Sequence, residues 1–386
     1  MFTRWLQLTP DWSCLLIGPR RSGKTTLLKR QFPDLKYVTL DDLDYLDWAS
    51  RDPKGFVREL GGSAIIDEIQ RHPKLTIAVK YAIDNNDAVF LMTGSSTLGL
   101  LDSASDSLAG RINIHSLPAA CWGEEMGTPT HKIFSEKPGP LQIKEANRSL
   151  RKAMSFGQFP EVLSCETEEK KQETLTRYKN TFFTRDLMQL SNMENLEGLL
   201  AIFHHLVNSL GSHLEVSNFA RESGVSQPTA KKYLNALSQA ELTFSMRGYQ
   251  FGPAKRFLKA NKTYFADNGI IHSMNIDTGR GALLENFVIS ELEKRRKLGY
   301  IPTDNFYYYK SAAGHEVDLI FETQKALYAI EIKSSRRPGG KDFRNLKNFH
   351  PQKEIPVKRF LFHLGQEYST VEDIQLLPVA ALFRGI

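Results

Sequence analysis

The chain has 386 residues, of which 41% are hydrophobic and 24% are charged, and its formal net charge is +6 at neutral pH. This composition excludes a disordered or collagen-like chain, and the length predicts roughly two to four domains. The modest positive excess permits nucleic acid as a partner without showing where on the protein the charge lies.

No stretch of the sequence has the character of a membrane or export segment. The longest apolar runs, such as 88–92, are as long as a strand and fall short of the roughly 20 residues that cross a bilayer. The N-terminus lacks the basic and apolar regions of a signal peptide, so we expect a cytoplasmic protein with no membrane partner. Cys14, Cys121 and Cys165 are widely spaced without a CxxC pair, which argues against disulfides and structural zinc and indicates core thiols.

The first predicted elements are a buried strand at 13–17, a glycine-containing loop and a helix that begins at Thr25. Glycines let the backbone N–H groups of such a loop turn towards phosphates, and the helix N-terminus adds its positive end. Lys24 is expected to reach the β- and γ-phosphates of ATP, and the Thr25 hydroxyl to hold Mg²⁺. The residues predicted to bind the nucleotide here are Gly18, Pro19, Arg20, Arg21, Ser22, Gly23, Lys24, Thr25 and Thr26.

A second acidic element, which this type of phosphate loop requires, follows at 63–68. An apolar strand ends there in Asp67 and Glu68. We expect Asp67 to bind Mg²⁺ through water, and Glu68 to act as the base that orients the attacking water.

Further apolar runs at 37–40, 88–92 and 111–115 alternate with helix-compatible segments, which predicts a five-stranded parallel α/β sheet. A ligand should then lie at the carboxyl ends of the strands. After the fourth run, Ser95 or Ser96 is a candidate sensor of the γ-phosphate, with a plain turn residue as the alternative. Arg111 is a candidate arginine finger that reaches a neighbouring subunit's nucleotide, with a surface ion pair as the alternative.

The order of several motifs resembles the bacterial and archaeal AAA+ ATP-binding proteins in which an AAA_14-type module is joined to a C-terminal domain of unknown function, family 4143. The resemblance covers nearly the whole chain, and it implies an ATPase with a winged-helix segment and a restriction-endonuclease-like C-terminal domain. The motifs that carry it are Gly18 to Thr25, Asp67 to Gln70, Thr93 to Ser96, Leu108 to Arg111, Gly157 to Glu161, Arg185 with Asp186, Gly281 to Asn286, Glu316 to Asp318, and Glu331 to Lys333.

The proline- and glycine-containing stretch 127–143 predicts a loop between domains. Residues 141–190 then have a helical pattern that would suit the lid of the ATPase. Arg185 is a candidate to project towards the nucleotide, and an ion pair with Asp186 is the alternative.

Helices predicted at 199–208, 216–223 and 226–237, with Gly224 in the turn, have helix-turn-helix spacing. Ser226 is a good N-cap for the last helix, and 243–249 and 263–265 are candidate wing strands. If the last helix enters a major groove, the residues that contact bases or phosphates are Gln227, Thr229, Lys231 and Lys232. Protein contacts are the alternative use of this fold.

The C-terminal part has a predicted helix at 281–292 and strands at 306–309, 316–321 and 326–333. Asp318, followed by Glu331 and Lys333 on the next strand, has the PD-(D/E)xK nuclease pattern, and Glu285 is the acid contributed by the helix. We expect Glu285, Asp318 and Glu331 to bind Mg²⁺ or Mn²⁺, and Lys333 to orient water or to stabilise the transition state. The basic residues at 334–337 and 341 suit a phosphate backbone.

The sequence thus predicts an α/β protein of four parts: an AAA+ P-loop ATPase domain (1–127), a helical lid-like segment (128–195), a winged-helix domain (196–262) and a nuclease-like α/β domain (263–386). The leading hypothesis is a homo-oligomeric ATPase, with a hexameric ring as one option, that uses ATP and Mg²⁺ to remodel branched or structured DNA and carries a nuclease domain. The alternative hypothesis is a regulatory ATPase switch whose silent nuclease fold only docks partners.

Overall fold

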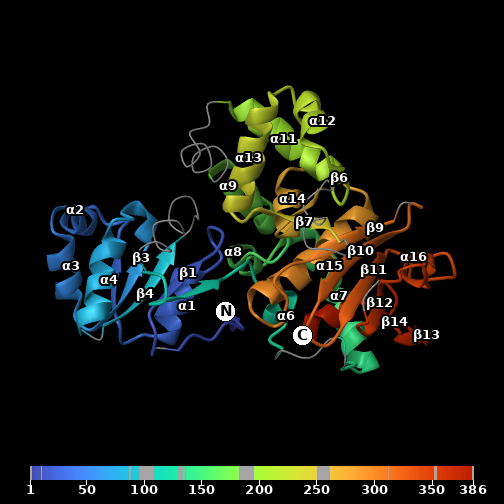
Figure 1. Cartoon of the computed structure of the whole chain (residues 1–386), viewed down its shortest axis with the longest axis horizontal. Coiled ribbons are helices and arrows are strands. Elements are labelled where there is room, and N and C mark those ends of the chain that lie inside the picture. Colours follow the sequence, from blue (N-terminus) through green and yellow to red (C-terminus); the bar gives the residue numbers. More distant parts are fainter. Residues whose placement is uncertain are drawn as a thin grey trace. The chain divides into compact units, whose positions relative to one another are not determined.

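The computed structural model describes residues 2–9, 11–86, 88–94, 108–128, 134, 136–181, 195–249, 261–311, 313–351 and 354–384 (Figure 1). Contacts divide the chain into two compact units. The N-terminal unit comprises 4–119 and 239–241, and the C-terminal unit comprises 1–3, 120–238 and 242–386. Residues 120–127, which we assigned to the ATPase domain, pack with the C-terminal unit, and the predicted boundary in the 127–143 loop stays a prediction.

The N-terminal unit is built on a five-stranded sheet in the order β2-β3-β4-β1-β5. All of its strand pairs are parallel, which confirms the predicted α/β class. These strands are short apolar runs. Such runs suit a parallel sheet because helices cover both of its faces and bury the strands. The strands are β1 Cys14–Ile17, β2 Lys36–Thr39, β3 Ser63–Asp67, β4 Val89–Gly94 and β5 Asn113–Ser116.

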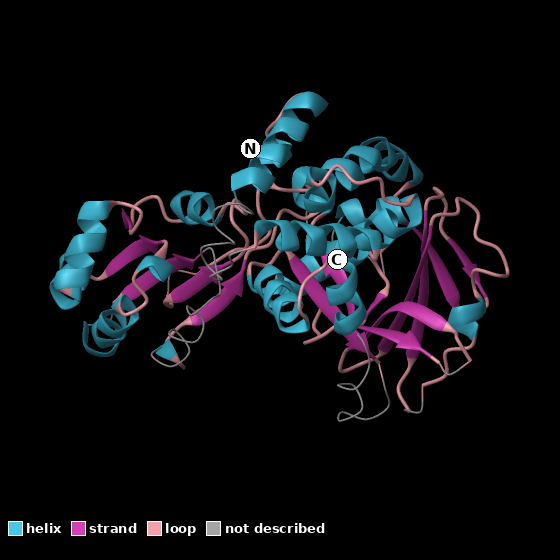
Figure 2. Ribbon diagram, turned by 90° about the horizontal axis from the view of Figure 1, so that it is seen from above, coloured by secondary structure: helices cyan, strands magenta, loops and turns pink. Residues whose placement is uncertain are grey.

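Helices pack against this sheet (Figure 2). Their boundaries follow from local capping, because Asp42 and Asp52 accept backbone N–H groups of the first turns of α2 and α3, and Pro53 begins α3. Phe56 is fully buried, and its ring makes T-shaped, edge-to-face contacts with Tyr45 and Trp48. The helices are α1 Lys24–Gln31, α2 Leu43–Arg51, α3 Pro53–Leu60, the 3₁₀ turn η1 Ile69–Arg71 and α4 Leu75–Asn86.

The C-terminal unit contains a nine-stranded sheet in the order β13-β14-β12-β11-β10-β9-β7-β8-β6. Strands β7 and β8, at the predicted wing positions, pair antiparallel, and Arg247 of β7 also pairs with Tyr307 of β9 in parallel. The wing and the nuclease-like strands therefore share one sheet, although we predicted separate domains. The strands are β6 His213–Leu214, β7 Thr243–Gly248, β8 Asn261–Phe265, β9 Tyr307–Lys310, β10 Glu316–Glu322, β11 Leu327–Lys333, β12 Val357–His363, β13 Ser369–Val371 and β14 Ile374–Pro378.

The helices of this unit include the three predicted for the helix-turn-helix, at α11, α12 and α13. Ser226 caps α13 as expected, since its hydroxyl accepts the Thr229 N–H at 3.2 Å. The helices are α6 Trp122–Glu125, α7 Pro140–Phe156, α8 Pro160–Leu163, α9 Glu168–Thr181, α11 Leu196–Asn208, α12 Val216–Glu222, α13 Gln227–Gln239, α14 Asn268–Ser273, α15 Arg280–Lys297, α16 Arg344–Lys347 and the 3₁₀ helix η4 Val379–Arg384.

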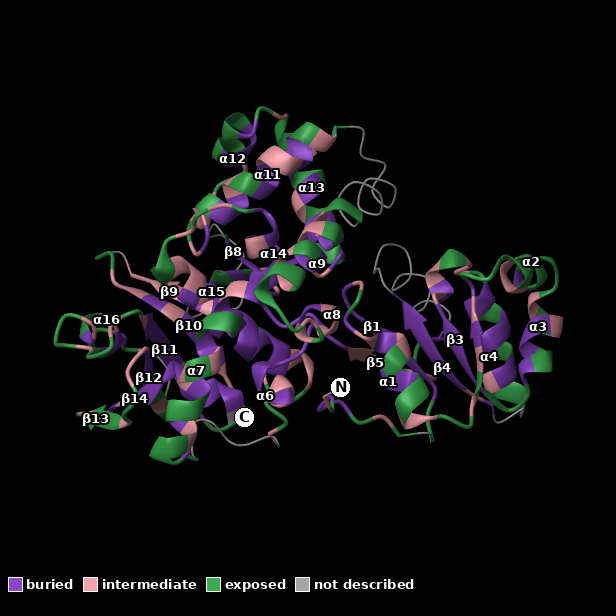
Figure 3. Ribbon diagram, turned by 180° about the vertical axis from the view of Figure 1, so that it is seen from behind, coloured by how far each residue is buried: buried purple, intermediate pink, exposed green. Residues whose placement is uncertain are grey.

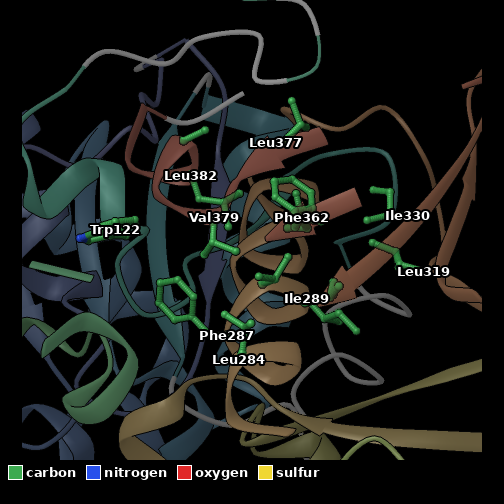
Figure 4. Packing of buried hydrophobic residues seen from close by; sticks show 14 of the residues in the cluster. Trp122, Leu284, Phe287, Ile289, Leu319, Ile330, Phe362, Leu377, Val379 and Leu382 are labelled. Atoms are coloured by element: carbon green, nitrogen blue, oxygen red, sulfur yellow. The ribbon is translucent and has the colours of Figure 1, made fainter. Parts of the chain in front are cut away.

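Helix α15 forms the centre of the core of the C-terminal unit (Figure 4). Its apolar side chains, among them Leu284, Phe287 and Ile289, pack with residues of the sheet and of η4, and all three are at most 2% exposed. Trp122 lies edge to face with Phe287 at a ring-centroid distance of 5.9 Å. The segment that follows the N-terminal unit is thus anchored in this core within three residues of Ala119.

Cys14 and Cys121 are buried, Cys165 is half-buried, and all three are free thiols. No helix in the part of the chain that the structure describes is long and apolar enough to span a bilayer.

Candidate functional site

The loop between β1 and α1 has a backbone that requires glycine at two positions. Gly18 has φ of 155°, and a Cβ atom there would lie 2.2 Å from the carbonyl oxygen of Leu117. Gly23 has φ of 92°, in the left-handed region that other residues rarely adopt. Arg21 also has a positive φ, of 61°. These dihedral angles curl the loop over the N-terminus of α1, where backbone N–H groups can meet phosphate oxygens.

Lys24 is the first residue of α1 and is only 6% exposed. Its ammonium donates to the carbonyl oxygens of Gly18 and Pro19 at 2.9 and 3.0 Å, so it lies inside the curve of the loop. Burial lowers the pKa of Lys24 to about 8. An anion that reaches this loop would therefore meet a buried, weakly solvated cation, which strengthens the attraction between them.

Arg4 supports the loop from the segment that precedes β1, a contact that the sequence pattern did not indicate. Its guanidinium donates to the carbonyl oxygens of Ser22 at 2.7 Å and Pro118 at 2.8 Å, and the residue is 8% exposed. A single arginine outside any motif gives no local signal of such a role. Arg4 joins the phosphate loop to the segment that follows β5.

Asp67 collects hydroxyl groups from three elements. Thr25 of α1 donates to its Oδ1 at 2.8 Å, Tyr37 of β2 donates to its Oδ2 at 2.8 Å, and Thr93 of β4 also donates to Oδ1. The Thr25 hydroxyl and the Asp67 carboxylate, which we predicted as the Mg²⁺ site, thus lie together. Tyr37 and Thr93 were missed, because only the order of the strands brings them beside Asp67.

Glu68 stands in the left-handed conformation with φ of 59°, which is a strained backbone for glutamate. Its N–H donates to the Thr93 hydroxyl at 3.2 Å, and its carboxylate accepts the side-chain amide of Gln70. Such strain is often found where a side chain is held in a functional direction. Gln70 is therefore a further residue that orients the candidate base.

The donor set fits Mg²⁺ and ATP. A hard divalent cation takes oxygen ligands, which Thr25 and Asp67 offer at hydrogen-bond distance from each other. Gly18 lets the loop pass close to the Leu117 backbone, and the Lys24 ammonium lies inside the loop. Residues 18–26 and Asp67 remain our prediction for the nucleotide site.

Arg111 forms the surface ion pair that we considered as its alternative role. Its Nε lies 2.6 Å from Asp84 Oδ1 of α4, and its Nη1 donates to the carbonyl oxygen of Ala109 at 3.2 Å. Both side chains of the pair are about one-third exposed. The arginine-finger role stays a prediction. Ser95, Ser96, Arg185 and Asp186 lie outside the described residues.

The predicted DNA-contacting face of α13 lies on the protein surface. Gln227, Lys231 and Lys232 are exposed, and Thr229 is half-buried with its hydroxyl hydrogen-bonded to that of Ser226 at 2.7 Å. The Thr229 hydroxyl is thus engaged with the N-cap residue Ser226. The other three side chains lie on the exposed face of the helix.

The strands β10 and β11 bring Asp318, Glu331 and Lys333 together as the sequence pattern predicted. Asp318 Oδ2 accepts the Ile332 N–H at 2.8 Å, and the Lys333 ammonium pairs with the Glu331 carboxylate. Asn345 of α16, which we did not predict, donates to Glu331 Oε1 at 3.1 Å. Burial and the nearby Asp318 raise the pKa of Glu331 to about 8, and burial also raises the pKa of Asp318.

Glu285 lies near Asp318 and makes contacts of its own. Its Oε1 accepts the Tyr264 hydroxyl at 2.7 Å, and the Lys262 ammonium lies 3.9 Å from the same atom. Burial and the Asp318 charge raise the pKa of Glu285 to about 7. Among the described residues no three His, Cys, Asp or Glu side chains are placed to hold one metal ion. The role of Glu285 as a ligand beside Asp318 and Glu331 stays a prediction.

Lys262 places a positive charge beside Glu285. It is 3% exposed on β8 and also pairs with the Glu316 carboxylate, so a fixed positive charge lies among the acids. Its position two residues before Tyr264 places both side chains on one face of β8. In the sequence, only this spacing indicates that Lys262 and Tyr264 share a face. We did not assign β8 to the nuclease-like sheet, so the contact between Lys262 and the acids was not predicted.

The remaining pair, Asp318 and Glu331, retains a feature that suits a cation. Glu331 Oε2 is buried and makes no hydrogen bond to any described atom. An unpaired buried carboxylate oxygen costs free energy unless a proton or a cation compensates it. Asp318, Glu331 and Lys333 therefore fit a divalent metal, and the metal site stays a prediction.

Comparisons with known proteins identify three regions. Residues 12–125 match a family described as AAA domain, residues 147–280 match a domain of unknown function (DUF8612), and residues 280–382 match another (DUF4143). The first and third matches confirm the resemblance found in the sequence.

Two similar proteins are each described as an uncharacterized protein. One from Mycobacterium tuberculosis is 28% identical over 343 residues, which cover 84% of this chain and 70% of that protein. One from Methanocaldococcus jannaschii is 25% identical over 354 residues, which cover 84% of this chain and 76% of that protein. A solved structure of the Aeropyrum pernix ORC1 protein in complex with DNA covers 74% of this chain and 88% of that chain, at 14% identity and a TM-score of 0.29. A TM-score this low supports no inference.

Proposed function

We propose that this chain, which joins an AAA domain to a C-terminal DUF4143 region, is an oligomeric ATPase that uses Mg²⁺ and ATP to act on DNA. The observation that carries the ATPase part is the arrangement of Lys24, Thr25 and Asp67 at the glycine loop. Mg²⁺, when bound, neutralises the charge of the phosphates. Lys24 holds the terminal phosphates, Thr25 and Asp67 hold the cation, and Glu68 accepts a proton from the attacking water.

The DNA part of the proposal is supported by the exposed cationic face of α13. Lys231 and Lys232 lie on a helix whose N-terminus is capped and whose opposite face is buried through Ala230, Tyr233 and Leu237. A helix held rigidly in this way can present its outer side chains to a groove. The substrate proposed is branched or structured duplex DNA, and the work proposed is remodelling or branch movement.

Replacing Lys231 and Lys232 together by alanine is expected to weaken binding to duplex DNA. If both side chains contact phosphate, the slope of log affinity against log salt concentration should fall by about 1 to 2. Fluorescence anisotropy with labelled linear, forked and four-way DNAs measures this change. A double alanine variant at Lys152 and Lys170, exposed lysines on α7 and α9, is the charge-matched control. Unchanged affinity in the α13 variant would favour protein contacts.

DNA-stimulated ATP hydrolysis separates this proposal from a regulatory ATPase switch. An enzyme that remodels DNA should hydrolyse ATP faster with the DNA structure on which it works, and the α13 variant should lose that stimulation while it keeps its basal rate. A rate that no DNA structure changes would favour the switch.

A second candidate function, metal-dependent DNA nicking, is favoured by the Asp318, Glu331 and Lys333 arrangement. Mg²⁺ or Mn²⁺, when bound, would supply an activated water and neutralise charge on a phosphodiester. Asp318 and Glu331 would bind the cation, and Lys333 would stabilise the negative charge that develops on the phosphate. The buried, unpaired Glu331 Oε2 is the observation in favour of this function.

Asp318→Asn, Glu331→Gln and Lys333→Ala should each abolish nicking of supercoiled plasmid with Mg²⁺ or Mn²⁺. Each removes a charge that its neighbours cannot replace. Glu322→Gln, at the other end of β10, is the matched control and should nick like the parent, and melting curves exclude unfolding. A parent that cuts nothing with either metal would make this domain a docking module.

A further inference from the structure

A large cavity of about 1090 Å³ lies in the C-terminal unit, away from α13. Its wall comes from α7, the start of α15, the segment after β11 and the connection between β12 and β13. Figure 3 shows exposed turns along α7 beside this part of the sheet. We had predicted basic residues after β11, and the fold brings two of them, Arg336 and Arg337, to one cavity with cationic residues of α7.

The wall of this cavity is strongly cationic. Its basic residues are Lys144, Arg148, Arg151, Arg280, Arg336 and Arg337, and the one carboxylate of the wall is Glu367. None of the six cations forms an ion pair with a carboxylate of the described residues. Their mutual repulsion is therefore not offset by the protein itself, and an anion would relieve it.

We propose that this cavity binds the phosphodiester backbone of a single-stranded nucleic acid. Lys144, Arg148 and Arg151 are spaced by four and three residues, so they share one face of α7. Seven residues of helix are about 10 Å long. A nucleic-acid strand carries one charge per about 3.4 Å of duplex axis, so this row matches several phosphates rather than one.

The composition of the wall distinguishes a backbone from a small nucleotide. It contains no Phe, Tyr or Trp, and His363 is its one aromatic side chain. Binding should thus depend on phosphate charge and on strand length, and be almost independent of base sequence.

The cavity adjoins the Asp318, Glu331 and Lys333 arrangement along the sheet. Lys333 of β11 is paired in register with His363 of β12, and His363 is part of the cavity wall. Arg336 and Arg337 follow Lys333 by three and four residues. A nucleic-acid strand held in the cavity would therefore contact a wall residue, His363, that pairs with Lys333 in the sheet. The inference itself needs neither nicking activity nor binding by α13, and so goes beyond the proposed function.

The test compares the parent with Arg148→Ala/Arg151→Ala in binding to labelled oligothymidylates of 5, 10 and 20 nucleotides. We expect the affinity for the longest strand to fall at least tenfold, and the salt slope to fall by about 1.4 if both arginines contact phosphate. Lys152→Ala on the same helix is the matched control, because Lys152 is exposed and lies outside the cavity wall, 3.7 Å from Glu168. Melting curves show that the variants are folded.

Three results would overturn the inference: equal affinities for the parent and the double arginine variant, an equal loss in Lys152→Ala, or parental binding that is independent of strand length. Competition with inorganic tripolyphosphate tests the last result, binding that is independent of strand length. If it displaces every oligonucleotide at one concentration, the cavity binds small anions instead. The Lys231 and Lys232 variant keeps this test separate from the proposed function, because it should retain its affinity for single strands while it loses duplex binding.

Discussion

Replacing Lys24 by alanine is expected to slow ATP hydrolysis by roughly 100-fold or more while the protein stays folded. The reason is that Lys24 is the buried cation inside the glycine loop, held by the carbonyl oxygens of Gly18 and Pro19. Its removal takes away charge that stabilises the phosphates in the transition state, and it spares the fold because a buried ammonium is costly to desolvate. Phosphate release at saturating Mg²⁺ and ATP measures the rate, and Lys74→Ala, at an exposed site, is the control.

The lowered pKa of Lys24 gives this experiment a second readout. With a pKa of about 8, the free side chain is mostly neutral at pH 8.5. A bound polyphosphate favours the charged form, so ATP binding at that pH should take up most of a proton, and ATP affinity should fall as the pH rises above 8. Calorimetry in two buffers of different ionisation enthalpy measures the uptake. Equal binding enthalpies in both buffers would contradict the role of Lys24.

The second large effect is expected for Glu291→Gln, which should lower the free energy of unfolding of the C-terminal unit by about 3–5 kcal/mol. Glu291 is fully buried on α15, where it accepts the Trp122 N–H at 3.1 Å and pairs with Lys294 and Arg295. Although burial opposes its charge, Lys294 and Arg295 hold the pKa of Glu291 below its usual value. The variant would leave the two cations with too little compensating charge.

Urea denaturation of the parent and the variant measures this loss, with Glu145→Gln on the exposed side of α7 as the control. Because the folded-state pKa of Glu291 is depressed, its contribution is present above the unfolded value of 4.5 and is lost as the pH falls below it. The difference between parent and variant should therefore shrink in acid. A variant as stable as the parent at neutral pH would show that the buried network contributes little.

The phosphate loop was predictable because its requirements are local. Gly18, Gly23, Lys24 and Thr25 follow one another between a strand and a helix, and each is needed for its own backbone angle or functional group. The partners of Asp67 were not predictable in the same way. Tyr37 and Thr93 reach it from neighbouring strands, so their role depends on the order of the sheet, which the sequence motif does not state.

The nuclease-like site also combines residues that a local pattern predicts with a residue that only long-range strand pairing brings near. Asp318, Glu331 and Lys333 lie on adjacent strands, and a period of two predicted their common location. Lys262 comes from β8, more than fifty residues before Asp318, and β8 reaches the sheet only because β7 pairs with β9. That long-range pairing places the Lys262 ammonium beside Glu285. The residues around Glu285 in the sequence do not predict this contact.

The phosphate loop lies against the chain segment that leads out of the N-terminal unit. The phosphate loop rests on the backbone of Leu117 and, through Arg4, on Pro118. Two residues after Pro118, the carbonyl oxygen of Ala120 accepts a hydrogen bond from the Lys294 ammonium of α15. A chain segment of this length spans only about 3.6 Å per residue even when fully stretched. Only a few peptide bonds therefore join the residues that contact the phosphate loop to the residue that contacts α15.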